Sequence, residues 1–149
     1  MKRIVSHEAN FKLWLLISQL SHSIILARQQ ELNQHDMPVR QYQILRIIQD
    51  QGVEATLSKI SLEAERKANV ISRITMRMEK DGLIKRTKIK PKSNLLRLEL
   101  TQKGVDIVNA SKESKSIDKI FSSLSSEEQK QLESILNKLI ISCKEESPA

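Results

Sequence analysis

The chain has 149 residues, which is enough for one domain, and its 39% of hydrophobic residues is too large a share for a disordered protein. Its single cysteine excludes an intramolecular disulfide, and its three glycines leave no room for a glycine-rich phosphate loop. The net charge is +7, and residues 53–104, with 13 basic and 6 acidic side chains, carry the whole excess. Such a field favours a polyanionic partner.

Apolar periodicity predicts a long first helix over residues 9–33. Leu13, Ile17, Leu20 and Ile24 recur at three- and four-residue spacing. Other apolar side chains widen this stripe beyond what one neighbouring helix would bury, so we expect a partner chain against it. Its uninterrupted apolar run is too short for a membrane span, and we expect a cytoplasmic protein without a membrane partner.

Three shorter helices are expected next: one over residues 39–50, one that begins at a Thr56 cap, and one over residues 68–81. The last of these would end at a glycine. Its inward positions are predicted to be Ile71, Ile74 and Met78.

The periodicity then changes to two, which predicts strands over residues 84–90 and 95–100. Turn-forming residues 91–94 join them, so the pair forms a basic hairpin. Two short helices followed by such a hairpin make the winged helix-turn-helix arrangement.

The remaining chain is expected to hold two helices. One would begin at a Thr101 cap and cover residues 102–123, and the other would cover residues 126–143. Ser125 and Glu128 have the spacing of a capping box at the start of the second. The predicted fold is therefore mainly α with a small β-hairpin wing.

Short motifs follow one another in a fixed order along residues 41–104. They are Gln41-Tyr42 with Ile44-Leu45, Ile71-Ser72-Arg73-Ile74, the run from Met78 to Arg86, and Leu100-Thr101 with Gly104. In order and spacing these pieces resemble the MarR family of transcriptional regulators, and Leu124-Ser125 with Glu127-Glu128 fits the same pattern.

The resemblance implies an obligate homodimer built from the first and the last two helices of each chain. Residues 1–36 and 101–149 would be dimerisation helices, and residues 37–100 would be a winged helix-turn-helix lobe, all within one structural domain. The implied partner is double-stranded DNA with a pseudo-palindromic operator. The implied function is a ligand-responsive repressor, with an effector pocket between the dimer region and the DNA lobe.

Two departures from the family pattern stand out. The wing commonly carries Asp-x-Arg, but this chain has Lys92-Ser93-Asn94, so minor-groove contacts would fall to Lys90, Lys92 or Asn94. The turn before the recognition helix usually carries a glycine and then an apolar residue, but this chain has Glu65-Arg66. That turn is therefore either a longer helix or packed differently.

The helix over residues 68–81 is the expected recognition helix. Arg73 can pair bidentately with guanine, while Asn69 could read adenine. Arg77 lies one turn deeper, where a phosphate contact is expected; an ion pair of either arginine within the helix stays open. The predicted contacts on this helix are Lys67, Asn69, Val70, Ser72, Arg73, Met76 and Arg77.

The wing lysines are expected to neutralise phosphates, which adds affinity without sequence information. The predicted wing contacts are Arg86, Lys88, Lys90, Lys92, Ser93 and Asn94.

An effector cavity could be lined by Trp14, Ile17 and His22 together with Tyr42, although core and dimer packing explains these residues as well. No His or Cys pair has metal-site spacing, so no metal or cofactor is expected. Cys143 has Lys144 beside it but no second cysteine that could resolve an oxidised thiol.

Two alternatives stay open. One is a winged-helix architectural or RNA-binding protein without operator specificity, and the other is an interaction module whose hairpin binds an acidic protein. No Ser-His-Asp, Cys-His or phosphate-binding arrangement supports an enzyme.

Overall fold

The computed structural model describes residues 6–91 and 95–147. The chain divides into two compact units, Met1–Ser114 and Lys115–Ala149. No helix in the described ranges is long and apolar enough to cross a bilayer.

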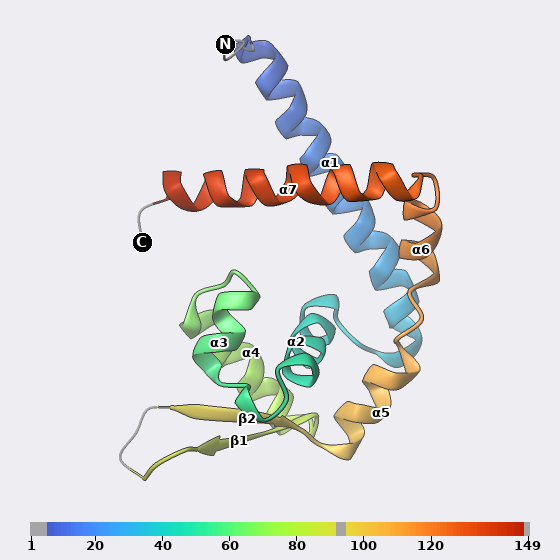
Figure 1. Cartoon of the computed structure of the whole chain (residues 1–149). Helices are drawn as coiled ribbons and strands as arrows, with labels where there is room; N and C mark the ends of the chain where they lie inside the picture. The colour runs from blue at the N-terminus through green and yellow to red at the C-terminus, as the bar shows by residue number, and fades with distance from the viewer. Residues whose placement is uncertain (1–5, 92–94, 148–149) are drawn as a thin grey trace. The chain divides into compact units, whose positions relative to one another are not determined.

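The first unit holds seven regular elements and two short 3-10 turns (Figure 1). They are α1 (His7–Leu32), η1 (Asn33–His35), α2 (Val39–Gln51), η2 (Gly52–Glu54), α3 (Leu57–Glu63), α4 (Ala68–Lys80), β1 (Ile84–Lys88), β2 (Leu96–Leu100) and α5 (Gln102–Ala110). The second unit holds α6 (Lys115–Phe121) and α7 (Ser126–Glu146). This mainly helical fold with one antiparallel hairpin confirms the predicted class.

Side-chain caps start the helices where the sequence places them. The hydroxyls of Thr56 and Thr101 accept hydrogen bonds from the backbone N–H of the third residue of α3 and of α5, respectively. Ser125 and Glu128 form the predicted capping box, with distances of 3.1 and 3.0 Å. The backbone N–H of Ser125, which donates to the carboxylate, lowers the pKa of Glu128.

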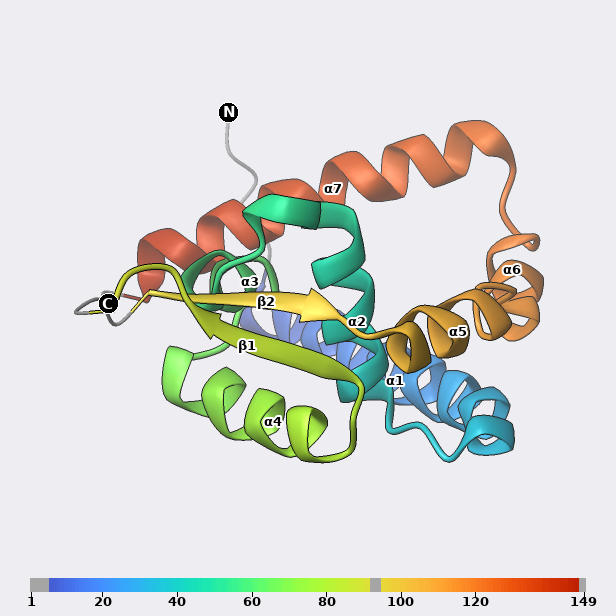
Figure 2. The same cartoon turned by 90° about the horizontal axis from the view of Figure 1, so that it is seen from below.

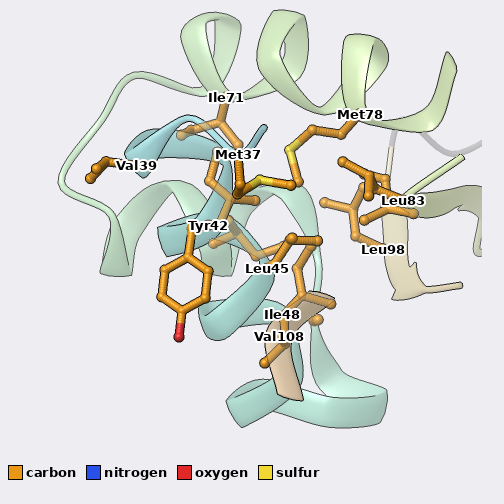
Figure 3. Close-up of a cluster of buried hydrophobic side chains, with 14 of the residues drawn as sticks. Met37, Val39, Tyr42, Leu45, Ile48, Ile71, Met78, Leu83, Leu98 and Val108 are labelled. Atoms are coloured by element: carbon orange, nitrogen blue, oxygen red, sulfur yellow. The ribbon is translucent and has the colours of Figure 1, made fainter. Parts of the chain in front are cut away.

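One apolar core holds α2, α4, the hairpin and α5 together (Figure 3). Leu45 from α2, Met78 from α4 and Leu98 from β2 are fully buried in it. Each contributes roughly 1.5–3 kcal/mol by leaving water. The winged-helix lobe is therefore built around its own core.

The inward face of α4 differs in one position from the prediction. Ile71 and Met78 are buried as expected, but Ile74 is only half-buried, and Thr75 is fully buried instead. Residues 71, 75 and 78 share one helical face. The Thr75 hydroxyl can be buried there because it donates to the Ile71 carbonyl at 2.8 Å.

The hairpin is shorter than predicted, because strand pairing runs only from Ile84 opposite Leu100 to Lys88 opposite Leu96. In Figure 2, β1 lies between α4 and β2, so the wing strands are attached directly to α4. Gly104 in α5 lies so close to the Leu83 carbonyl oxygen that a Cβ at this position would collide with it. Only glycine fits there.

The single helix predicted over residues 102–123 is wrong: α5 ends at Ala110, and α6 begins at Lys115. The chain leaves the helix at Ser111, whose carbonyl accepts hydrogen bonds from Arg28 and from the Tyr42 hydroxyl, at 2.5 and 3.1 Å. These bonds fix the backbone at the end of α5 against side chains of α1 and α2.

The turn between α3 and α4 is not a longer helix. Glu65 adopts the left-handed conformation with φ of 54°, which glycine usually occupies. The N–H of Glu65 donates to the Leu62 carbonyl, and the N–H of Arg66 donates to the Ser61 carbonyl, at 3.2 and 3.1 Å. These two bonds are the Schellman pattern, and they stop α3 so that α4 can begin.

Two helices keep large apolar side chains exposed along most of their length. On α1, only Arg28 and Leu32 are buried. Its exposed apolar residues are Phe11, Leu13, Trp14, Leu15, Leu16, Ile17, Leu20, Ile25 and Leu26, and those of α7 are Ile135, Leu136, Leu139, Ile140 and Ile141. Continuous apolar faces of this kind mark interaction surfaces.

Candidate nucleic-acid interface

The outer face of α4 carries most of the residues predicted to contact DNA. Its exposed members are Lys67, Asn69, Arg73, Met76 and Arg77. The buried face of the helix packs into the core, so this opposite face is held toward solvent by the fold itself. Exposed cations on a rigid helix are the arrangement that major-groove contacts require.

Two other predicted contacts on α4 are half-buried. Ser72 accepts a hydrogen bond from Nη2 of Arg86 at 3.3 Å, and Val70 lines a cavity beneath the helix. These two side chains therefore connect α4 to the rest of its own lobe.

Arg86 joins the wing to α4. Its backbone N–H donates to Oε2 of Glu79 at 2.7 Å, while its guanidinium reaches Ser72 from the strand side. Glu79 is thereby engaged by β1, and within the described residues neither Arg73 nor Arg77 forms an ion pair. The alternative of an ion pair inside the helix is not what the structure shows, so both guanidinium groups remain available.

Lys88, at the end of β1, and Lys90, just beyond it, are exposed. Both belong to the same compact unit as α4, so the wing cations and the exposed cations of α4 lie in one unit of the chain. The predicted contacts Lys92, Ser93 and Asn94 lie outside the described residues.

The four residues predicted to line an effector cavity occupy different surroundings. Trp14 is 66% exposed and Ile17 is 45% exposed, and His22 on the same helix is exposed too. Tyr42 is buried instead, with its ring at the edge of the labelled core cluster and its hydroxyl directed away from it (Figure 3).

Tyr42 forms part of a polar cluster that ties α1 to the lobe. The guanidinium carbon of Arg28 lies 4.7 Å from the centre of the Tyr42 ring. Arg28 also pairs with Glu31 at 2.8 Å, and both Arg28 and Tyr42 donate to the Ser111 carbonyl. Three segments far apart in sequence therefore meet at one buried arginine.

A cavity of about 480 Å³ lies between α2, the turn after α3, and α4. Tyr42 lines it, but Trp14, Ile17 and His22 do not. Arg40, Arg46 and Arg66 line it too, and sequence reasoning did not single them out. The available signal was a pair of arginines, Arg40 and Arg46, on the same helix α2.

Groups of three or more potential metal-ligating side chains are not found in the described part of the chain. Cys143 is exposed near the end of α7 and is a free thiol.

The comparisons with known proteins agree with this geometry. The model of the MarR family matches residues 37–90, which run from the start of α2 to the wing. The search of curated proteins returned no match.

Among solved structures, the ligand-free organohalide-sensing transcriptional regulator RdhR-CbdbA1625 is 28% identical, with a TM-score of 0.79 over 93% of this chain and 86% of that chain. The S. aureus MepR–DNA complex is 24% identical, with a TM-score of 0.77 over 87% and 96%. AbsC, a MarR family transcriptional regulator from Streptomyces coelicolor, is 16% identical, with a TM-score of 0.83 over 96% and 99%. The last two show the likeness of the fold alone.

Proposed function

We propose that the chain is a dimeric transcriptional regulator of the MarR family that binds double-stranded DNA sequence-specifically, because the MarR family model matches residues 37–90, which form its winged-helix lobe. Residues 37–100 would be the DNA-binding lobe, and residues 1–36 and 101–149 the dimerisation helices. It would act in the cytoplasm as a ligand-responsive repressor. No part of this proposal requires a catalytic step.

One observation carries the proposal: the outer face of α4 holds Arg73 and Arg77 exposed and free of ion pairs with described residues. An arginine near the start of a recognition helix can read guanine through two parallel hydrogen bonds. If these basic side chains served only to keep the surface solvated, they would not need to gather on the outer face of one helix beside a basic wing.

The exposed apolar faces of α1 and α7 support the dimer. A helix as apolar as α1 with only two buried residues is expected to pack against another chain. A symmetric dimer presents two recognition helices about one DNA turn apart, roughly 34 Å, and so reads a site with dyad symmetry.

The effector part of the proposal has two supports. RdhR-CbdbA1625 is described as organohalide-sensing and has been solved with 2,4-dichlorophenol bound, again at 28% identity and a TM-score of 0.79. This chain also holds a cavity against α4, although it lies within the winged-helix lobe and not between that lobe and the dimer region, where the resemblance implies an effector pocket. An effector would act by favouring dimers whose lobes are spaced differently from those that fit the operator.

Selection from random duplexes tests the proposal without knowledge of the operator. Purified protein is incubated with a random-sequence library, and bound duplexes are amplified and sequenced over successive rounds. We expect enrichment of one motif with dyad symmetry, with half-sites about one helical turn apart. Persistent absence of any enriched motif would contradict sequence-specific binding and favour the architectural or RNA-binding alternative.

A further inference from the structure

The cavity of about 480 Å³ lies wholly within the first unit and touches the inner side of α4. Its aliphatic lining comes from Ile44 and Ile47 on α2 and from Val70 and Ile74 on α4. Cavities of this volume hold small organic molecules, and aliphatic walls favour an aliphatic ligand body.

Three arginines line the same cavity: Arg40 and Arg46 on α2, and Arg66 directly before α4. Within the described chain, none of them forms an ion pair, and Nε of Arg46 is buried without a hydrogen-bond partner. The only carboxylate that lines the cavity, that of Glu63, accepts a hydrogen bond from Nε2 of Gln51 at 2.7 Å. A buried cationic donor left without an acceptor is costly, so a bound acceptor would relieve it.

We propose that this cavity is a binding site for an organic monoanion with an aliphatic body, a medium-chain carboxylate. The carboxylate accepts hydrogen bonds from Arg46 and from Arg40 or Arg66, because a guanidinium matches its planar geometry. The hydrocarbon body packs between Ile47 and Ile74. An inorganic anion would leave the aliphatic walls uncovered, and a neutral hydrocarbon would leave the arginine unpaired.

This site differs from the effector cavity expected between the dimer region and the DNA lobe, since its walls come from α2, α3 and α4 with the turn between the last two. Its occupation also has a direct consequence for α4. A carboxylate bound to Arg66 neutralises a positive charge next to Lys67. The hydrocarbon body of the ligand also packs against Val70 and Ile74, which belong to α4 itself. Ligand binding should therefore weaken DNA binding; this consequence rests on the proposed function, whereas the site itself does not.

Calorimetric titration of the full-length protein, without DNA, tests the site. The probes are octanoate, 1-octanol and inorganic phosphate. We expect octanoate to bind at one class of site per protomer, and octanol and phosphate to bind at least about tenfold more weakly, because each lacks one half of the recognition.

Substitutions locate the binding. Arg46→Gln is expected to weaken octanoate binding at least about tenfold. Arg97→Gln is the matched control, because Nε of Arg97 is also buried without a partner but lies on β2, outside the cavity. Arg66→Gln, at an exposed position, gives a second test should Arg46→Gln fail to fold, and it too is expected to weaken binding.

Equal binding of octanoate and octanol would overturn the proposal, as would unchanged affinity in Arg46→Gln and Arg66→Gln. Anisotropy of labelled operator DNA, with and without octanoate, separates this result from the proposed function. A protein that binds octanoate but no duplex keeps the site and loses the regulator. A protein that binds its duplex but not octanoate keeps the proposed regulator and overturns the site.

Discussion

Glu65 is a single residue on which the placement of α4 depends. Its left-handed backbone ends α3, and the N-cap of α4, Lys67, follows two residues later. A side chain with a Cβ is strained in that conformation by roughly 1–2 kcal/mol, and glycine escapes the strain at some cost in chain entropy. The turn is thus held in place by its hydrogen bonds despite an unfavourable residue.

Glu65→Gly is therefore expected to be more stable than Glu65→Ala by about 1 kcal/mol, because both lack the carboxylate and only alanine keeps the Cβ. Thermal unfolding followed by circular dichroism measures the difference, which corresponds to a few degrees in Tm. An alanine variant as stable as the glycine variant would contradict the left-handed turn.

Arg28 is the second residue with an effect beyond its own position. Arg28→Met removes a charged donor from Glu31 and from the Ser111 carbonyl while it keeps most of the side-chain volume. We expect a decrease of about 2 kcal/mol in the free energy of unfolding, since hydrogen bonds to charged groups contribute roughly 1.5–3 kcal/mol.

Tyr42→Phe is the graded comparison for Arg28→Met. It removes only one neutral donor to the Ser111 carbonyl, which Arg28 continues to satisfy, so we expect a decrease of about 1 kcal/mol in the free energy of unfolding. Urea titrations of both variants measure the order. A tyrosine variant that costs more than the arginine variant would show that the Tyr42 hydroxyl, not the Arg28 guanidinium, holds the end of α5 in place.

At the scale of elements, the wing is the part that should bind DNA without reading its sequence. Lys88 and Lys90 are exposed at the end of the hairpin and belong to the same compact unit as α4. Replacing both with alanine should weaken binding to every duplex alike. The slope of log affinity against log salt should fall by about one for each phosphate that the wing no longer neutralises.

Titrations at several salt concentrations measure that slope. Lys130→Ala is the control, because it removes a lysine from α7, which lies outside the winged-helix lobe. A slope that stays the same in the double wing variant would mean that these lysines do not bind phosphates.

Helix starts could be predicted from the sequence because their signals are local. Thr56, Thr101 and the pair Ser125–Glu128 each act within three residues, and each cap is present. The change of period also predicted the two strands. The predicted end of β1 lies two residues too late, and the predicted start of β2 lies one residue too early.

What the sequence could not show depends on residues that meet only after folding. The Ser111 carbonyl at the end of α5 is bound by Arg28 and Tyr42, which lie 83 and 69 residues from Ser111. The bond from Arg86 to Ser72 and the convergence of arginines on the cavity beneath α4 also join residues that are distant in sequence. Periodicity marks which face of a helix is apolar, but it does not say which partners that face will meet.

At the scale of the whole molecule, the exposed apolar faces of α1 and α7 are the surfaces on which the proposed dimer depends. Leu139 lies among the exposed apolar residues of α7 and is 44% exposed in the single chain. Leu139→Asp would place a charge in the proposed dimer interface and is expected to shift the protein toward monomer. Sedimentation velocity measures the shift, with circular dichroism to confirm that helices remain.

Lys130→Asp is the matched control for that experiment, because it introduces the same aspartate at a position of the same helix that is already charged. It should leave the dimer intact. A Leu139→Asp protein that sediments as a dimer would place the interface elsewhere.

Sequence-specific reading by α4 is the central claim, and fluorescence anisotropy tests it most directly. Binding is measured to the duplex upstream of the protein's own coding sequence and to a scrambled duplex, with wild type, Arg73→Ala and Arg77→Ala. The wild type should prefer the native duplex by at least about a hundredfold. Arg73→Ala should lose that preference but keep salt-dependent binding, while Arg77→Ala should weaken both duplexes alike. Equal binding of the wild type to the two duplexes, or a preference that survives Arg73→Ala, would contradict the account.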